Sequence, residues 1–94
     1  MENRLTIFYL ENCPYCRKAI RAAKELETEL PGFSADSISW IEERECADIA
    51  DRYDYYRVPS IFLGDEKLYE CSPSDDYDEI KRNLKAAVET AIAG

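Results

Sequence analysis

The chain has 94 residues, of which 46% are hydrophobic and 34% are charged; 20 acidic residues stand against 12 basic ones, and the formal net charge is −8. This composition predicts one folded domain over residues 1–94, too small for two cores and too apolar to be disordered. The acidic balance argues against a surface that follows nucleic-acid phosphates, and no apolar run is long enough to span a membrane. The acid excess serves solubility in the simplest interpretation; an alternative is that it steers basic protein partners.

The first third of the chain predicts a strand followed by a helix. Residues 4–10 are almost continuously apolar, which is typical of a strand buried on both faces. A helix is expected from Pro14 to about Leu30, because proline is tolerated in a first turn and Pro31-Gly32 ends the pattern. Its apolar stripe is expected to consist of Ile20, Ala23, Leu26 and Leu30.

The middle of the chain predicts three more short strands and a short helix. Residues 37–41 alternate enough to form a second strand, and a shorter helix is expected over about residues 46–53. Residues 60–63 and 67–69 flank Gly64-Asp65, a pair that is typical of a β-hairpin turn.

The last part of the chain predicts a helix that begins near Ser72. The run Ser72-Pro73-Ser74-Asp75 has a serine followed three residues later by an acid, and a proline suited to a first helical position. This helix is expected to bury Ile80, Leu84, Ala87, Val88 and Ala91. The order of elements predicts an α/β domain with a four-stranded mixed sheet, flanked on both faces by about three helices, whose first two strands are parallel.

The most informative motif is Cys13-Pro14-Tyr15-Cys16, which lies where the first strand gives way to the helix. Two sulfurs one helical turn apart allow one thiol to attack a disulfide and the other to release the mixed disulfide. We expect Cys13 to be the nucleophile, because N–H groups at a helix start stabilise a thiolate. Cys16 lies one turn further and is expected to be the resolving thiol. The chain has no histidine, so no imidazole can act as the base.

This motif, the Val58-Pro59 pair downstream and the order of elements are shared with one known family. On these features, essentially the whole chain resembles the glutaredoxin branch of the thioredoxin-like superfamily. The resemblance implies a thioredoxin-like fold with a cis bond before Pro59, and a thiol-disulfide oxidoreductase without a tightly bound cofactor. It implies that glutathione is a co-substrate, and that Tyr15 and the backbone of Val58 border the substrate groove. Arg57 replaces the threonine of the family pattern.

The resemblance also suggests binding residues by position. Arg52 or Arg57 could bind the glycine carboxylate of glutathione, with ion pairing to nearby acids as the alternative role. Asp75 or Asp76 could supply an acidic contact for the other end of glutathione, after a two-residue insertion. The family holds that γ-glutamyl end with the backbone of a Gly-Gly pair, and counting from Pro59 puts Tyr69-Glu70 there. Many members of the family have a lysine three residues before the nucleophilic cysteine, and this chain has Leu10 at that position.

These departures leave an alternative open, namely that the protein is a glutaredoxin-like redoxin that receives its electrons from thioredoxin reductase. The expected partners are disulfide-containing proteins or glutathione mixed disulfides, with no nucleic acid and no membrane. We expect a monomer. The first apolar run is too short for a signal-peptide core and has no cleavage site after it, so a cytoplasmic protein is expected.

Two further cysteines and two other function classes complete the predictions. Cys46 is expected to be a small core residue, and Cys71 a partly exposed thiol open to oxidation or a passive residue. A structural zinc site would need all four cysteines, but a second close cysteine or histidine pair is missing, so no metal is expected. A non-catalytic peptide-binding module would have no evident use for both Cys13 and Cys16.

Overall fold

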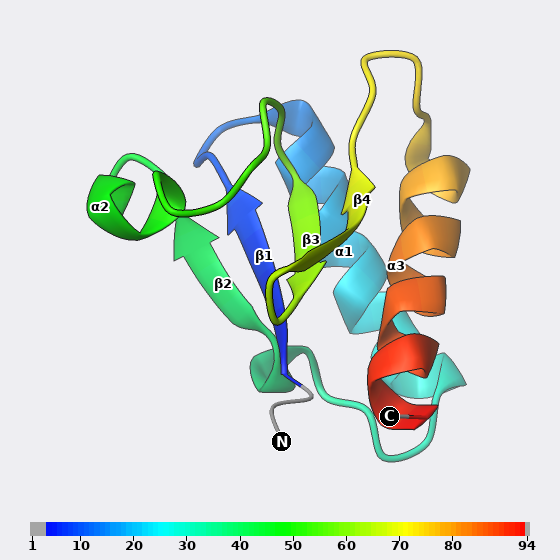
Figure 1. Cartoon of the computed structure of the whole chain (residues 1–94). Helices are drawn as coiled ribbons and strands as arrows, with labels where there is room; N and C mark the ends of the chain where they lie inside the picture. The colour runs from blue at the N-terminus through cyan, green and yellow to red at the C-terminus, as the bar shows by residue number, and fades with distance from the viewer. Residues whose placement is uncertain (1–3, 94) are drawn as a thin grey trace.

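The computed structural model describes residues 4–93 and has an α/β architecture compatible with the thioredoxin-like fold (Figure 1). Four strands form one mixed sheet in the order β2-β1-β3-β4. The elements are β1 (Leu5–Tyr9), α1 (Pro14–Glu29), the 3₁₀ helix η1 (Ala35–Ser37), β2 (Ser39–Glu42), α2 (Ala47–Ala50), β3 (Ser60–Leu63), β4 (Glu66–Glu70) and α3 (Tyr77–Ala93). Within residues 4–93, no helix is both long enough and apolar enough to cross a bilayer.

The sheet has the mixed topology that the sequence predicts. β1 pairs in parallel with β2 and antiparallel with β3, and β3 pairs antiparallel with β4. The hairpin turn lies at Gly64-Asp65 as expected, and Gly64 has a positive φ of 60°, which glycine adopts at little cost. A register shift between Ile61 and Phe62 marks an irregularity in the β3–β4 pair, so that Ser60 lies opposite Glu70.

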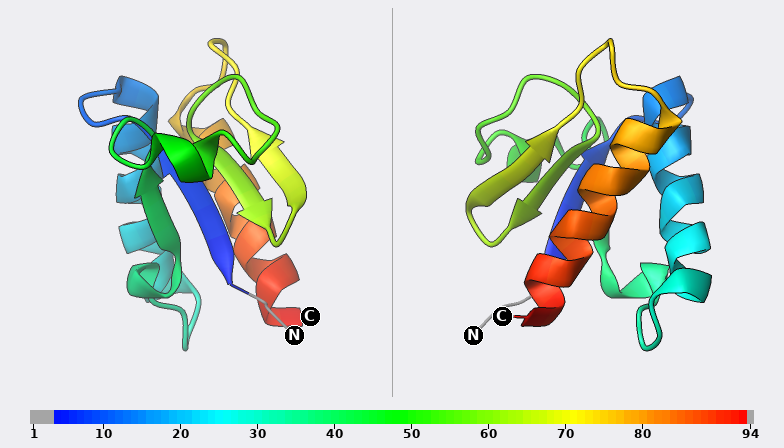
Figure 2. Two further views of the ribbon diagram at one scale, coloured as in Figure 1. Left: turned by 60° about the vertical axis from the view of Figure 1, so that its left-hand side comes forward. Right: turned by 90° about the vertical axis from the view of Figure 1, so that its right-hand side faces the viewer.

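The two long helices cover one face of the sheet and α2 covers the other (Figure 2). On the first face, Ile7 packs with the buried side chains of α1 and α3. On the second face, Phe8 packs with Ala50, and its ring stacks on that of Tyr55 at 4.9 Å between centroids. Successive residues of β1 therefore enter different cores, which confirms that this strand is buried on both faces.

Three details of the predicted elements are wrong, namely the buried face of the first helix, the end of the short helix and the start of the second strand. The buried stripe of α1 consists of Cys16, Ala19, Ala22, Ala23 and Leu26. Ile20 and Leu30 are only partly buried, because the helix turns its small residues inward, where the closely packed α3 leaves little room. The short helix ends at Ala50, before the expected residue 53. The second strand begins at Ser39, because residues 35–37 form a 3₁₀ helix whose first N–H groups Ser34 caps.

The start of the last helix is also later than predicted. α3 begins at Tyr77, and the carboxylate of Asp76 accepts the N–H of Glu79 at 2.9 Å, as an N-cap residue does. The predicted cap, Ser72, instead closes a separate turn in which its N–H donates to Asp75 and its carbonyl accepts the N–H of Asp75. The buried face of α3 is as expected, except that Ala91 is only partly buried.

Candidate active site

Three loops meet at the end of the sheet opposite the chain termini, in the upper part of Figure 1. They are the loop between β1 and α1, the segment between α2 and β3, and the segment between β4 and α3. Each loop carries residues that the sequence singles out, namely Cys13, Val58-Pro59 and Cys71. The fold therefore gathers the candidate site from three distant parts of the chain.

Cys13 lies at the start of α1 as predicted, where it is the N-cap residue, and its side chain is half-buried. Its carbonyl accepts the N–H of Arg17 at 3.0 Å, which closes the first helical turn, and Pro14 follows in the first helical position. Its sulfur makes no capping bond to the helix and interacts instead with the thiol of Cys16, so the two sulfurs of the motif lie close together. Asn12, with a positive φ of 71°, turns the chain into the helix, and its side chain accepts a hydrogen bond from Arg17.

Cys16 lies one turn into α1 and is only 1% exposed. Its sulfur accepts the N–H of Leu10 at 3.4 Å. The pKa of the Cys16 thiol is raised to about 12, mainly by burial and also by the nearby Cys13 and Cys71, while the hydrogen bond from the Leu10 N–H acts in the opposite direction. Cys16 is therefore a protonated, protected thiol at neutral pH, which matches the chemistry of a resolving residue better than that of a first nucleophile. All four cysteines of the chain are free thiols.

The peptide bond between Val58 and Pro59 is cis, as the resemblance implies. Pro59 itself is buried, whereas Val58 lies in the wall of a groove. This groove, which we call the Val58 groove, has a volume of about 260 Å³. Its lining residues are Leu10, Tyr15, Glu43, Tyr56, Arg57, Val58, Cys71, Ser72 and Pro73.

The groove contains some of the predicted binding residues and not others. Tyr15, Val58 and Arg57 line it, as expected. Arg52 is exposed outside it, because the chain between α2 and β3 turns this side chain into solvent. Within residues 4–93, the guanidinium of Arg57 forms no ion pair, so the alternative role of pairing with nearby acids is not observed.

The two aspartates that the sequence suggests for ligand binding have structural roles instead. Asp75 accepts the hydroxyl of Tyr69 at 2.5 Å and the N–H of Ser72 at 3.0 Å, and these contacts lower the pKa of its carboxyl. Asp76 caps α3. Neither residue lines the Val58 groove, because the carboxylate of Asp75 bonds within its own turn and that of Asp76 bonds to the first turn of α3.

Glu42 is a site residue that the sequence analysis does not find. Its side chain is 5% exposed at the end of β2, and its carboxylate accepts the N–H of Glu11 at 3.0 Å and that of Arg44 at 2.6 Å. The Glu11 bond fixes the loop that leads to Cys13. An acidic residue directly after the alternating run of residues 37–41 was the available signal, but the sequence shows no donor within reach of it.

Of the other two cysteines, Cys71 is buried, which agrees with the passive role and not with a partly exposed thiol, and Cys46 is not in the core as expected. Cys71 is 3% exposed and packs with Ala19 and Ile80, whereas Cys46 is only half-buried in front of α2. Cys71 is buried because it directly follows β4 and its N–H bonds to the carbonyl of Pro59. Among the described residues, no group of three or more histidines, cysteines or acids is placed to hold a metal ion.

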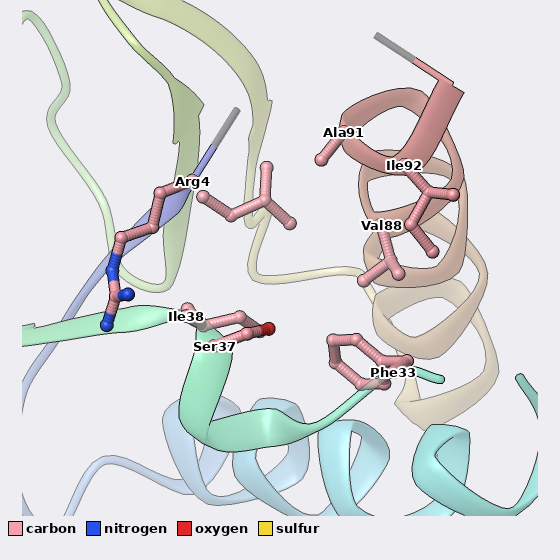
Figure 3. A pocket seen from close by; sticks show the side chains of 8 residues that line it. Arg4, Phe33, Ser37, Ile38, Val88, Ala91 and Ile92 are labelled. Carbon is pink, nitrogen blue, oxygen red and sulfur yellow. The ribbon is translucent and has the colours of Figure 1, made fainter. Parts of the chain in front are cut away.

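A larger hollow of about 380 Å³ lies at the opposite end of the molecule, beside the chain termini (Figure 3). Its walls include Phe33 and Ile38 on one side and Val88, Ala91 and Ile92 of α3 on the other. These side chains are apolar, and the other described lining residues, among them Arg4 and Ser37, place no thiol or carboxylate in the hollow. The Val58 groove is smaller, but it adjoins the cysteine motif and is the better candidate for a reaction site.

The chain was compared with models of known protein families and with curated proteins, and neither comparison found a match. The class of protein therefore rests on the fold and on the residues of the site.

Proposed function

We propose that this protein is a thiol-disulfide oxidoreductase of glutaredoxin type, in which Cys13 is the nucleophile and Cys16 the resolving thiol. The observation that carries the proposal is the pairing of a half-buried thiol at a helix N-terminus with a buried thiol one turn on. The cis bond before Pro59 and the adjoining groove support it, since a disulfide substrate needs a surface to lie on.

The reaction has two exchange steps. The Cys13 thiolate attacks one sulfur of a substrate disulfide, forms a mixed disulfide, and releases the other substrate sulfur as a thiolate. Cys16 then loses its proton and attacks the Cys13 sulfur, which releases the second substrate thiolate and leaves a Cys13–Cys16 disulfide. The substrate gains two electrons and, on protonation, two protons, and an external thiol system must later reduce the protein.

The high pKa of Cys16 determines which of the two cysteines attacks the substrate first. A thiol with a pKa of about 12 is a poor nucleophile at neutral pH, so Cys16 does not compete with Cys13 for the first attack. Formation of the mixed disulfide removes the thiol or thiolate of Cys13, one of the groups that raise the pKa of Cys16. We infer that the substrates are disulfide-containing proteins or mixed disulfides and that the protein acts in the cytoplasm.

A single-turnover experiment tests the proposal without any choice of electron source. The protein is reduced, freed of reductant and mixed with a protein disulfide such as insulin, and its mass is followed. The wild type should lose two hydrogens as Cys13 and Cys16 become a disulfide. Cys16→Ser should accumulate a mixed disulfide at Cys13, Cys13→Ser should not react, and the matched control Cys46→Ser should behave as the wild type. Undiminished reaction of Cys13→Ser would overturn the proposal.

A further inference from the structure

A second hollow lies beside α2 and adjoins the Val58 groove. It has a volume of about 550 Å³, larger than that of the groove, and Glu43 and Tyr56 line both. We call it the Tyr56 hollow; its walls include the side chains of Glu43, Asp51, Tyr53, Tyr55 and Tyr56. Because the groove and the hollow share a wall, a substrate chain that leaves the groove on this side passes the hollow.

Tyr56 is a solvent-exposed aromatic residue on a fixed backbone. Its side chain is 89% exposed, and its ring contacts no other ring and no basic side chain among residues 4–93. Its N–H nevertheless donates to the carboxylate of Glu70 at 2.8 Å, which holds the residue in place. Such a tyrosine gains contact area on binding and loses little conformational entropy, so it is typical of a recognition surface.

The two carboxylates of the hollow have no cation of their own. Within residues 4–93, Asp51 forms no ion pair and no side-chain hydrogen bond, and Glu43 accepts the hydroxyl of Tyr55 at 2.6 Å without a basic partner. Burial and the charges of both acids raise the pKa of Tyr55, so the two carboxylates act on the same ring. Arg44 also lines the hollow, but its guanidinium already pairs with Glu42 at 3.3 Å.

The inner wall of the hollow is aromatic and rigid. The rings of Tyr53 and Tyr55 pack on that of Phe8, at 4.7 and 4.9 Å between centroids. A surface that combines tyrosine rings with carboxylates attracts a cation twice, through the negative faces of the rings and through ion pairing. A planar guanidinium can stack on a ring while it donates to a carboxylate, so arginine is better suited to this wall than lysine.

We propose that the Tyr56 hollow binds an arginine side chain of the protein whose disulfide reacts at Cys13. The guanidinium stacks on the ring of Tyr56 and pairs with the carboxylate of Asp51. This inference rests on the oxidoreductase function proposed above and adds a determinant of substrate choice outside the Val58 groove. A bound arginine must lie at a fixed distance along the substrate chain from the reacting sulfur, whereas attraction by the net charge of −8 has no such requirement.

The test uses short, unstructured peptides whose one cysteine is in a mixed disulfide with a chromophoric thiol. A single arginine is placed at successive positions on either side of the cysteine, and citrulline, its uncharged isostere, replaces it in a matched set. Rate constants with the reduced full-length protein are measured by stopped flow. At one or two neighbouring positions, arginine should give a saturable reaction about fivefold to tenfold faster than citrulline, as one ion pair with one cation–π contact allows. Elsewhere the two should agree within about twofold.

Three variants make the test specific to the hollow. Asp51→Asn and Tyr56→Leu should each lower the rate constant of the best arginine peptide by about threefold relative to its citrulline counterpart. Both side chains are exposed, so the fold should tolerate these changes. Asp54→Asn is the matched control, because it removes the same charge from the same segment. Asp54 does not line the hollow and acts on Lys67 instead, so this variant should keep the full preference for arginine.

Two kinetic outcomes would overturn the inference. One is equal rates for arginine and citrulline at every position. The other is a gain that is the same at all positions and that Asp51→Asn and Asp54→Asn reduce equally, since it would reflect the net charge alone.

Absence of reaction with every peptide would contradict the oxidoreductase function instead, and binding would then test the hollow. Peptides with serine in place of cysteine should shift the NMR signals of Asp51 and Tyr56 when they carry arginine and not when they carry citrulline. Equal shifts with both, or none, would overturn the inference as well.

Discussion

The carboxylate of Glu42 accepts the backbone N–H of Glu11 at 3.0 Å, and so joins the end of β2 to the loop that carries Cys13. We predict that Glu42→Gln loosens this loop, because an amide has one acceptor oxygen where the carboxylate has two. The Glu11 N–H should then exchange with solvent faster than in the wild type, as measured by hydrogen–deuterium exchange. Glu45→Gln, an exposed acid of the same segment, is the matched control. Equal protection of Glu11 in both variants would contradict the assigned role.

The same residue gives a prediction for acid stability. Hydrogen bonds from Glu11 first, and then from Arg44 and Glu45, lower the pKa of Glu42 from an ordinary value near 4.5 to about 2, against desolvation. A lowered pKa means that the carboxylate stabilises the fold above about pH 4.5, and that this stability is lost as the pH falls toward 2. The free energy of unfolding should therefore fall in this window, and less steeply in Glu42→Gln. Parallel pH profiles for the two proteins would show that Glu42 does not contribute.

Glu70 is predicted to hold the segment that precedes the cis bond. Its carboxylate accepts the N–H groups of Tyr56 and Arg57, so Glu70→Ala should leave these donors free and Val58 less well placed. The KM for a protein disulfide should rise more than kcat falls, because the groove is affected and the cysteines are not. Glu66→Ala, which removes an exposed acid from the same strand, should have no such effect. A loss confined to kcat would argue against this role.

The four cysteines should react with iodoacetamide in an order set by their surroundings. Cys13 and Cys46 are half-buried and should be alkylated first. Cys16 and Cys71 are 1% and 3% exposed, and burial raises the pKa of both, so they should react slowly at neutral pH. Mass spectrometry of peptides from a time course gives the four rates, with denatured protein as the reference. Labelling of Cys71 as fast as that of Cys46 would contradict the buried position of Cys71.

The core between the sheet and the long helices should dominate stability. Leu26 is 0% exposed on α1, and Leu26→Ala is expected to lower the free energy of unfolding by about 2–5 kcal/mol, the usual cost of such a cavity. Ile92→Ala removes a side chain of similar size that is 64% exposed, and it should cost well under about 1 kcal/mol. Urea unfolding of the two variants measures the difference. Similar losses would mean that Leu26 is not at the centre of the core.

Features that depend on neighbouring residues were predictable from the sequence. The apolar run of β1, the hairpin at Gly64-Asp65 and the helix start at Cys13-Pro14 all follow from short-range preferences of the backbone, and the structure has all three. Element order predicted the mixed sheet, because a strand-helix-strand unit favours parallel neighbours and a tight turn makes antiparallel ones. The Cys13–Cys16 pair needed only the spacing of one helical turn.

Contacts between distant segments were decided by the tertiary structure alone. Tyr15 meets Pro73 and Glu42 meets Glu11 only after the sheet has brought their loops to one end of the molecule. The side chains of Asp75 and Asp76 could have faced a ligand as far as the sequence shows, but their own turn and helix offered nearer N–H groups. A buried N–H must find an acceptor somewhere, and which acceptor is within reach depends on the complete fold.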